Sequence, residues 1–166
     1  RLLGERGWRL SEAAVREGLA AAVWPGRLEM VRQNPLVILD GAHNAAGAAA
    51  LRQALQDYFA GRRLVLLIGM LADKERAQAV ALLCPLAAAV VVTRPPGSRA
   101  GDWRAVAALA RQYTPVVYEE EEIPAAVARA LALAGSADVV VVTGSLYLLA
   151  EARAVLGSNL RTGRGA

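Results

Sequence analysis

Four short, uninterrupted apolar runs occur at nearly even intervals along this sequence. They are LVILD (36–40), RLVLLIG (63–69), AAVVVT (88–93) and DVVVVTG (138–144). Apolar runs without polar alternation are typical of strands that are covered on both faces, as in a parallel sheet. A weaker run at 115–118 predicts a fifth strand, nearer an edge of the sheet, and the four glutamates after it are expected at the solvated start of a helix.

Segments long enough for crossover helices separate these strands. Each begins with a residue that can cap a helix: Asn44, Asp73, Asp102 and Ser145. Because a crossover between parallel strands is right-handed, repeated strand–helix units form an open parallel sheet with helices packed on its faces. The sequence therefore predicts a doubly wound, Rossmann-like α/β fold with a mostly parallel sheet of about five or six strands flanked by helices.

The 166 residues are enough for one domain of ordinary size. We expect residues 24–157 to form that domain, with an additional edge strand within 26–32 whose direction the sequence leaves open. Residues 1–23, with a helix at 11–22, are expected to be a linker or hinge-adjacent segment, and residues 158–166 a flexible tail. The chain opens on Arg1 rather than Met, so we expect it to be part of a longer protein.

Composition excludes several classes of protein. Hydrophobic residues make up 55% of the chain and charged residues 20%, which excludes a disordered chain. Cys84 is the single cysteine and His43 the single histidine, so we expect no disulfide framework and no clustered His/Cys metal site. The presence of one cysteine indicates a reducing, cytoplasmic setting. Separately, we expect the protein to be a monomer.

The net charge of +4 does not by itself indicate a nucleic-acid partner. The 18 arginines and one lysine are scattered, without a basic stripe or interleaved aromatic residues, so we expect no nucleic-acid binding. The longest apolar runs, such as residues 64–72, are much shorter than the roughly 20 residues that a membrane-spanning helix needs. We therefore expect no membrane role.

The unusual polar residues follow the strands. The loops DGAHN (40–44), GMLADKE (69–75), TRPPGSRAGD (93–102) and TGS (143–145) all leave the carboxyl ends of predicted strands. Ligands of open parallel sheets bind beyond those ends, where helix N-termini converge. The opposite edge carries links such as GRR and AGSA, so the sequence predicts a functional site at the carboxyl edge.

The DGAHN loop supplies two candidates. Asp40 ends a buried strand and could accept hydrogen bonds from two ribose hydroxyls, or it could simply cap its own turn. His43 projects from a loop in which Gly41 permits a tight turn and Asn44 caps the next helix. Its place beside Asp40 favours a functional role over packing against that carboxylate.

Two basic residues are candidates for contacts with anions. Arg27 lies on a turn that Pro25 and Gly26 constrain, and its planar fork suits phosphate oxygens; the alternative is a solvated surface arginine. Lys74 lies at a predicted helix start, where it could reach an anion or form an ion pair with Asp73 or Glu75.

Arg99 and Ser145 complete the candidates. Arg99, in a loop rich in Pro and Gly, could contact an anionic ligand or remain in solvent. Ser145 could cap its helix or offer its hydroxyl to a carboxylate. Neither GxxxxGK[ST] nor GxGxxG is present, so this chain has no phosphate cradle of its own.

Four motifs together resemble a known family. They are WPGRLE (24–29), LDGAHN (39–44), GMLxDKE (69–75) and VVTGSLYLLAEAR (141–153), and they occur in the order and spacing of the C-terminal domain of folylpolyglutamate synthase/dihydrofolate synthase, a branch of the Mur ligases. The resemblance extends from about Leu10 to Leu156. This chain has Ala45 where the family usually has Pro, and Glu75 where it usually has Asp.

The resemblance implies an ATP-dependent ligase. Such enzymes phosphorylate a folate or dihydropteroate carboxylate, and the amine of L-glutamate then attacks the acyl phosphate. ATP and Mg²⁺ would be held mainly by an N-terminal ATPase domain that this chain lacks, so the fragment alone is expected to be inactive. The alternative is a non-enzymatic regulatory module that binds a nucleotide or another anion within this chain.

The resemblance also implies roles for the candidate residues. Arg27 would contact the phosphates of ATP and Asp40 its ribose. His43, as the catalytic residue, and Ser145 would position the incoming glutamate, and Lys74 and Arg99 would contact anionic groups of the substrates. The choice between dihydrofolate synthase, folylpolyglutamate synthase or both stays open, because recognition of the pterin is expected in the other domain.

Overall fold

A six-stranded sheet forms the centre of the computed structural model. The structure describes the backbone of residues 2–162, and it describes the exposure of the side chains at residue 2 and residues 5–157. The strands are β1 (Glu29–Gln33), β2 (Leu36–Leu39), β3 (Leu64–Ile68), β4 (Ala89–Thr93), β5 (Val117–Glu120) and β6 (Val139–Thr143). Their order is β1-β2-β6-β3-β4-β5, and every neighbouring pair is parallel except β1 and β2. The predicted fold class is therefore confirmed.

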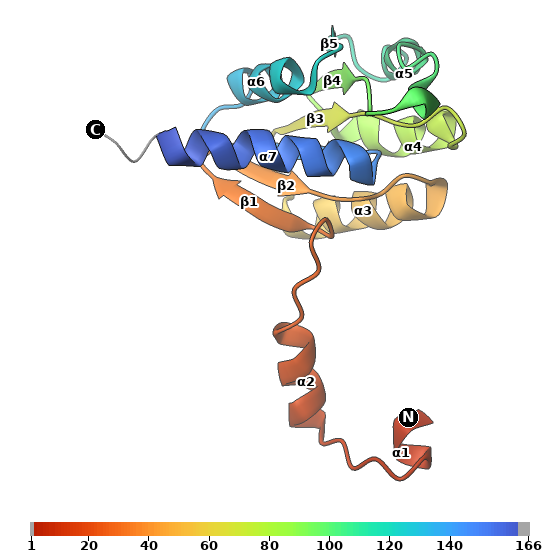
Figure 1. Cartoon of the computed structure of the whole chain (residues 1–166), viewed down its shortest axis with the longest axis vertical. Helices are drawn as coiled ribbons and strands as arrows, with labels where there is room; N and C mark the ends of the chain where they lie inside the picture. Colours follow the sequence, from red (N-terminus) through yellow and green to blue (C-terminus); the bar gives the residue numbers. More distant parts are fainter. Residues whose placement is uncertain (1, 163–166) are drawn as a thin grey trace.

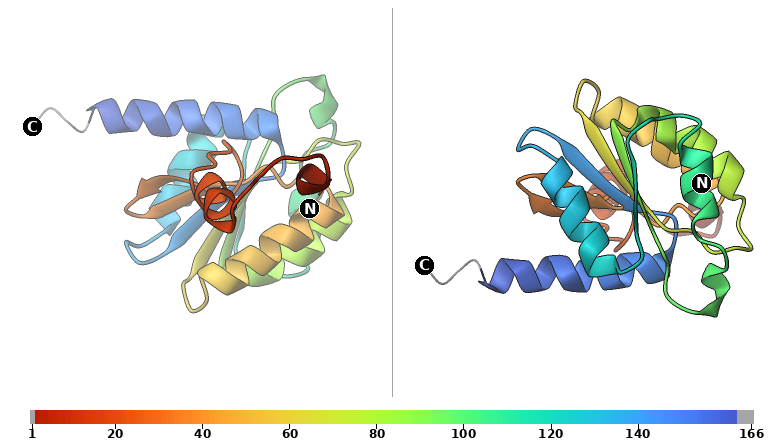
Figure 2. Two further views of the ribbon diagram at one scale, coloured as in Figure 1. Left: turned by 90° about the horizontal axis from the view of Figure 1, so that it is seen from below. Right: turned by 90° about the horizontal axis from the view of Figure 1, so that it is seen from above.

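Helices cover both faces of the sheet (Figures 1 and 2). The helices are α1 (Leu2–Glu5), α2 (Glu12–Ala20), α3 (Ala45–Tyr58), α4 (Arg76–Leu83), α5 (Ala105–Ala110), α6 (Ile123–Leu133) and α7 (Leu146–Thr162), with short 3₁₀ turns η1 (Cys84–Leu86) and η2 (Ser98–Ala100). Helices α3, α4 and α5 lie on one face, and α6 and α7 lie on the other.

The strands are apolar throughout because alternate residues enter two different cores. Ile38 and Leu66 pack with Leu51 of α3 on one face, whereas Leu39 and Leu148 of α7 lie in the core of the other face. Truncating one of these fully buried side chains to Ala would cost about 2–5 kcal/mol. This two-sided burial explains why no polar residue interrupts the central strands.

Both outer strands agree only in part with the sequence-based expectation. Strand β1 is the predicted additional edge strand, and the structure makes it antiparallel to β2. The expectation that the four glutamates start a helix is wrong for the first two, because Glu119 and Glu120 lie within β5. Edge exposure allows this, since Arg111 and Arg129 form ion pairs with these two carboxylates at 2.7 and 3.0 Å.

Two of the four predicted helix starts are confirmed. Asn44 accepts a hydrogen bond from the N–H of Gly47 at 2.8 Å, and Ser145 Oγ accepts one from Tyr147 N–H at 3.3 Å. The other two are wrong: α4 begins only at Arg76, and α5 only at Ala105. In both places the residues between strand and helix are used to build a longer loop at the carboxyl edge.

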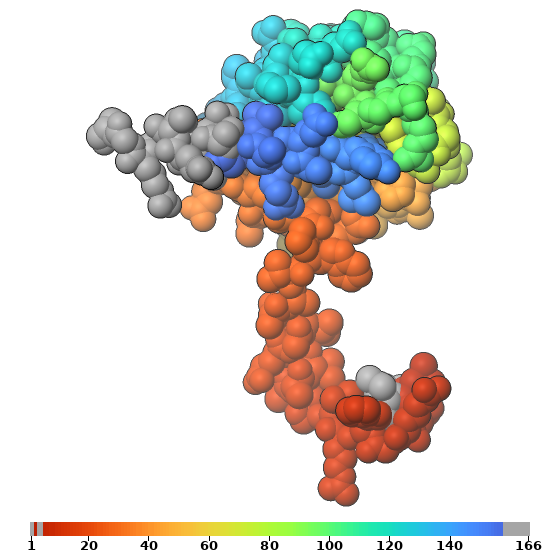
Figure 3. Space-filling view, in the orientation of Figure 1, coloured from red at the N-terminus to blue at the C-terminus, as the bar shows by residue number. Residues whose placement is uncertain are grey.

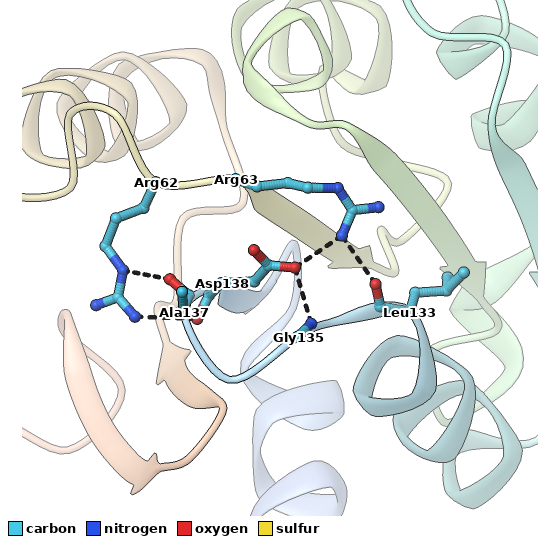
Figure 4. A network of polar contacts seen from close by, with 6 residues as sticks. All are labelled: Arg62, Arg63, Leu133, Gly135, Ala137 and Asp138. Atoms are coloured by element: carbon cyan, nitrogen blue, oxygen red, sulfur yellow. Dashed lines mark hydrogen bonds and ion pairs between the residues drawn. The ribbon is translucent and has the colours of Figure 1, made fainter.

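The opposite edge of the sheet is closed by a polar network (Figure 4). Arg62 donates hydrogen bonds to the carbonyls of Ala137 at 2.7 Å and Asp138 at 3.2 Å. Arg63 donates to the Asp138 carboxylate and to the Leu133 carbonyl, both at 2.8 Å. The GRR and AGSA links thus clamp one another, which is a structural role.

The N-terminal segment extends away from the α/β domain (Figures 1 and 3). Helix α2 buries none of its residues. Three large apolar side chains of this segment, Trp8, Leu19 and Trp24, have 65%, 73% and 74% of their surface exposed. At the other end, residues 158–162 continue α7 rather than leaving it, and residues 163–166 lie outside the described part of the chain. No helix within residues 2–162 is long and apolar enough to cross a bilayer.

Candidate functional site

Two of the clefts at the carboxyl edge of the sheet contain the predicted residues. The first, here called the Asp40 cleft, has a volume of about 550 Å³. It is lined by Arg27, Leu28, Asp40, Gly41, Ala42, His43, Asn44, Ala46, Gly47, Ala50, Leu51 and Ala54. The second, the Lys74 cleft, has a volume of about 160 Å³ and is lined by His43, Leu71, Lys74, Arg99, Gly144, Ser145, Leu146 and Tyr147. Every residue predicted for the site therefore lines one of two clefts, and His43 lines both.

Asp40 joins two segments that are far apart in sequence. Its side chain is 8% exposed, and Oδ2 accepts a hydrogen bond from Leu28 N–H at 3.0 Å. Oδ1 accepts a second hydrogen bond, from Ala42 N–H, at 2.9 Å. Leu28 has a φ of +43°, which is unfavourable for a branched side chain. Asp40 therefore holds the WPGRL turn, and each oxygen keeps a further lone pair for a ligand.

Arg27 lies directly over the DGAHN loop. Gly41 N–H donates to Gly26 O at 2.7 Å, which brings the two turns into contact. A Cβ on Gly41 would lie 2.3 Å from Nη1 of Arg27, so only glycine permits this approach. Arg27 itself is exposed, and the only hydrogen bond that its side chain makes among the described residues runs from Nη1 to Gly26 O at 3.1 Å. Most of its donors are therefore available to an anion.

The carboxylate of Glu29 stabilises the turn that carries Arg27. This carboxylate accepts a hydrogen bond from Gly26 N–H at 2.6 Å and forms a two-pronged ion pair with Arg153 of α7. The hydrogen bond from Arg153 lowers the pKa of the Glu29 carboxyl, and the same contact raises the pKa of Arg153. The turn that presents Arg27 is thus tied through Glu29 of β1 to α7.

His43 has a defined tautomer in this arrangement. Nδ1 lies 2.8 Å from the carbonyl oxygen of Gly41, and a carbonyl can only accept. Nδ1 therefore carries a proton, and in the tautomer with no second ring proton Nε2 is the acceptor. This geometry suits a group that accepts a proton or a hydrogen bond from an amine.

The Lys74 cleft combines cationic side chains with an aromatic ring. Lys74 Nζ lies 3.2 Å from Oδ2 of Asp73, and hydrogen bonding to Lys74 lowers the pKa of the Asp73 carboxyl. Arg99 donates to the hydroxyl of Tyr147 at 3.1 Å, and its guanidinium lies 5.6 Å from the centre of that ring. The local ion pair considered for Lys74 is present, and the lysine still lines the cleft.

Three residues at this edge are absent from the sequence-based candidates. Tyr147 orients Arg99, Glu29 braces the turn of Arg27, and Arg76 donates four hydrogen bonds to backbone carbonyls. Tyr147 and Glu29 belong to the motifs GSLY and WPGRLE, so their motifs offered a signal. Arg76 offered none, because it looks like any other surface arginine in this sequence.

The donor set indicates which groups the site suits. Arg27 offers unpaired N–H donors for phosphate oxygens, and Asp40 offers lone pairs for hydroxyl groups. No group of three His, Cys, Asp or Glu side chains within the described residues could hold a metal ion. Burial raises the pKa of the Cys84 thiol to about 12, which leaves it without nucleophilic character. These residues fit a nucleotide, and they supply no metal cage for Mg²⁺.

Comparison with known proteins defines the class of this domain. The family described as "Mur ligase, glutamate ligase domain" matches residues 26–146, so the chain belongs to the Mur ligase family as its glutamate ligase domain. Within that family its relatives include the dihydrofolate synthase/folylpolyglutamate synthase of Bacillus subtilis, 32% identical over 87% of this chain and 33% of that protein. The homologous protein of Mycobacterium tuberculosis is 46% identical over 60% of this chain and 20% of its own length.

Solved structures agree with this assignment. E. coli FolC in complex with DHPP and ADP superposes with a TM-score of 0.85 at 28% identity, over 95% of this chain and 37% of that chain. Folylpolyglutamate synthase of M. tuberculosis, complexed with ADP and AMPPCP, superposes with a TM-score of 0.82 at 37% identity, over 91% of this chain and 36% of that chain. The chain thus spans about a third or less of the length of these proteins.

Proposed function

We propose that this chain is the C-terminal domain of an ATP-dependent ligase that adds L-glutamate to a folate or dihydropteroate carboxylate through an acyl phosphate. One observation carries the proposal: a nucleotide-compatible cleft and a smaller cationic cleft share His43. A ligase of this kind must bring a phosphoryl donor and an anionic amino acid to one reacting carboxylate. The dihydrofolate synthase/folylpolyglutamate synthase among the relatives and the structure of E. coli FolC with DHPP and ADP support the same chemistry.

The Asp40 cleft is proposed as this domain's share of the ATP site. Arg27 would donate to the phosphates, and the free lone pairs of Asp40 would accept from the ribose hydroxyls. ATP supplies the phosphoryl group that activates the carboxylate. The resemblance to this family of ligases implies that Mg²⁺ would be held mainly by an N-terminal ATPase domain. The solved relatives with ADP, and one with AMPPNP and Mn, support a nucleotide and a divalent metal in the whole enzyme.

The Lys74 cleft is proposed as the glutamate site. Lys74 and Arg99 would offset the negative charge of the glutamate carboxylates, and the Ser145 hydroxyl would help to orient them. Nε2 of His43 would accept a proton from the glutamate ammonium, which frees the nitrogen lone pair to attack the activated carboxylate as inorganic phosphate leaves. These contacts position the nucleophile, and proximity of this kind contributes much of the acceleration in a two-substrate reaction.

Closure of this domain over a partner domain would protect the acyl phosphate from water. Residues 1–23 would link the two domains, and the exposed Trp8, Leu19 and Trp24 would be covered by the N-terminal domain. The single, buried Cys84 is consistent with a reducing cytoplasmic setting, and we propose a monomeric enzyme there.

The test uses the full-length protein, which contains this chain and the preceding domain, in a coupled ATPase assay. ADP release is measured with dihydropteroate or with tetrahydrofolate, in the presence and absence of L-glutamate. We expect glutamate-dependent ADP release with at least one of these acceptors. Activity without glutamate dependence, or none with either acceptor in a folded protein, would contradict the proposal.

Two variants separate the clefts. Arg27→Met should raise the KM for ATP by about tenfold or more, and Lys74→Met should do the same to the KM for glutamate. Arg52→Met is the matched control, because Arg52 lies on α3 and makes one long hydrogen bond, 3.4 Å to the Leu82 carbonyl. The control should change neither constant.

A further inference from the structure

The guanidinium of Arg76 is surrounded by backbone carbonyls. Nε donates to Leu71 O at 3.0 Å, and Nη2 donates to Met70 O at 2.7 Å and Ala100 O at 2.6 Å. Nη1 donates to Asp102 O at 2.7 Å. One half-buried side chain therefore satisfies four carbonyls, two on the loop after β3 and two on the loop after β4.

These two loops carry the cations of the Lys74 cleft. Lys74 lies on the loop after β3, and Arg99 on the loop after β4. The loops meet at one backbone hydrogen bond, from Ala72 N–H to Arg99 O at 2.8 Å. They also approach closely at Gly101, where an added Cβ would lie 2.8 Å from the Cβ of Ala72. The two loops are therefore in close contact, and Arg76 bridges them by donating to carbonyls on both.

Removing the guanidinium would leave the carbonyls of Met70, Ala100 and Asp102 without their donor, whereas Leu71 O would keep only the hydrogen bond from Lys74 N–H at 3.3 Å. Three of the four hydrogen bonds are part-buried, and a part-buried acceptor that loses its donor must find water, so the loops would shift to admit it. Burial lowers the pKa of Arg76, while Asp102 and Asp73 partly counteract this effect. Lysine could not substitute fully, because a single ammonium does not reach four carbonyls arranged around a planar fork.

We infer that Arg76 is a positioning residue for the Lys74 cleft. By joining the two loops, Arg76 holds Lys74 and Arg99 at a set separation. Arg76 does not line the cleft, so it acts through these residues rather than on a ligand. The inference rests on the proposed function, in which the cleft receives glutamate. A cleft whose two cations are misplaced by a fraction of an ångström binds a dicarboxylate more weakly.

The test compares Arg76→Met and Arg76→Lys with the Arg52→Met control in the full-length protein. For Arg76→Met we expect the KM for glutamate to rise by about tenfold, with the KM for ATP within about twofold of the parent value. Arg76→Lys retains the charge and part of the hydrogen bonding, so its KM for glutamate should lie between the values of the parent protein and of Arg76→Met. A merely structural role would instead lower the active fraction, and with it kcat, while leaving both KM values unchanged.

Hydrogen exchange supplies a readout that does not depend on activity. The Ala72 amide, which is bonded to Arg99 O, should exchange faster in Arg76→Met, whereas amides within β3 should keep their rates. An unchanged Ala72 rate, or an unchanged KM for glutamate in a folded Arg76→Met, would overturn the inference. If Arg76→Met fails to fold, Arg76→Lys is judged by the same two measurements, and failure of both variants to fold would also overturn a positioning role.

Lys74→Met distinguishes this inference from the proposed function. If Lys74→Met leaves the KM for glutamate unchanged, the assignment of the cleft to glutamate fails. If Lys74→Met raises that KM and Arg76→Met does not, only the positioning role fails. The variant that combines Lys74→Met with Arg76→Met should raise the KM for glutamate by less than the two single effects combined. This is because both substitutions act through the contact between Lys74 and glutamate.

Discussion

The backbone N–H of Leu28 donates a hydrogen bond of 3.0 Å to the carboxylate of Asp40, twelve residues along the chain. This bond joins the turn that presents Arg27 to the loop that carries His43. Since Leu28 has a positive φ, the turn is held in a conformation that it would not adopt alone. Asp40 is thus a structural anchor as well as a candidate ligand for ribose.

Replacing Asp40 should therefore affect both stability and nucleotide binding. Asp40→Ala removes two hydrogen bonds to backbone N–H groups, and we expect the free energy of unfolding of this chain to fall by about 1–3 kcal/mol. In the full-length protein the KM for ATP should rise as well. Denaturant titration and steady-state kinetics measure the two effects. Asp57→Asn, at an exposed position of α3, is the control and should change neither.

Gly41→Ala tests the approach of Arg27 to the loop. The new Cβ would lie 2.3 Å from Nη1 of Arg27 and 2.6 Å from a methyl group of Leu146, so the arginine must move. We expect a higher KM for ATP and, because Leu146 also lines the Lys74 cleft, a smaller rise in the KM for glutamate. Gly157→Ala, at a helical position with open space around it, is the matched control. Equal kinetics for both variants would mean that the position of Arg27 has no bearing on ATP.

The Glu29–Arg153 pair predicts a specific acid sensitivity. The pKa of Glu29 in the folded chain lies below its ordinary value of 4.5, so the pair stabilises the fold at higher pH. That stabilisation is lost as the pH falls from about 4.5 through the lower pKa of the folded state. Glu29→Gln should remove this part of the pH dependence of the melting temperature. Glu17→Gln, which alters an exposed carboxylate on α2, should leave the profile intact.

Asp138→Asn should weaken the fold without affecting the site. The Gly135 N–H and then Arg63 hold the pKa of the Asp138 carboxyl below its ordinary value, at the edge of the sheet opposite the clefts (Figure 4). We expect a lower melting temperature by scanning calorimetry and unchanged KM values for ATP and glutamate. A shift in either KM would show that the two edges of the sheet are coupled.

The central strands were predictable because burial on both faces leaves a local trace. Each of β2, β3, β4 and β6 is an uninterrupted apolar run, and the loops that follow them could be assigned to one edge by topology alone. Asn44 and Ser145 were predictable for a similar reason, since a cap acts on residues two or three positions away.

The failures share a physical cause. Asp73 and Asp102 have the local chemistry of caps, but Arg76 binds carbonyls on both of their loops, and this long-range contact outweighs local preference. The glutamate run looks like a solvated segment until arginines from α6 and the end of α5 are seen to pair with it in β5. In each case the partner comes from another part of the chain.

By itself the sequence determined the class of fold, the edge of the sheet that carries the site and the residues with suitable chemistry, because strands, caps and parallel topology follow from local patterns. Only the tertiary structure decided that Asp40 anchors the turn of Arg27, that His43 lines both clefts, and that Arg76 joins two loops. Those relationships depend on distances between segments brought together by packing, and no spacing along the chain encodes them.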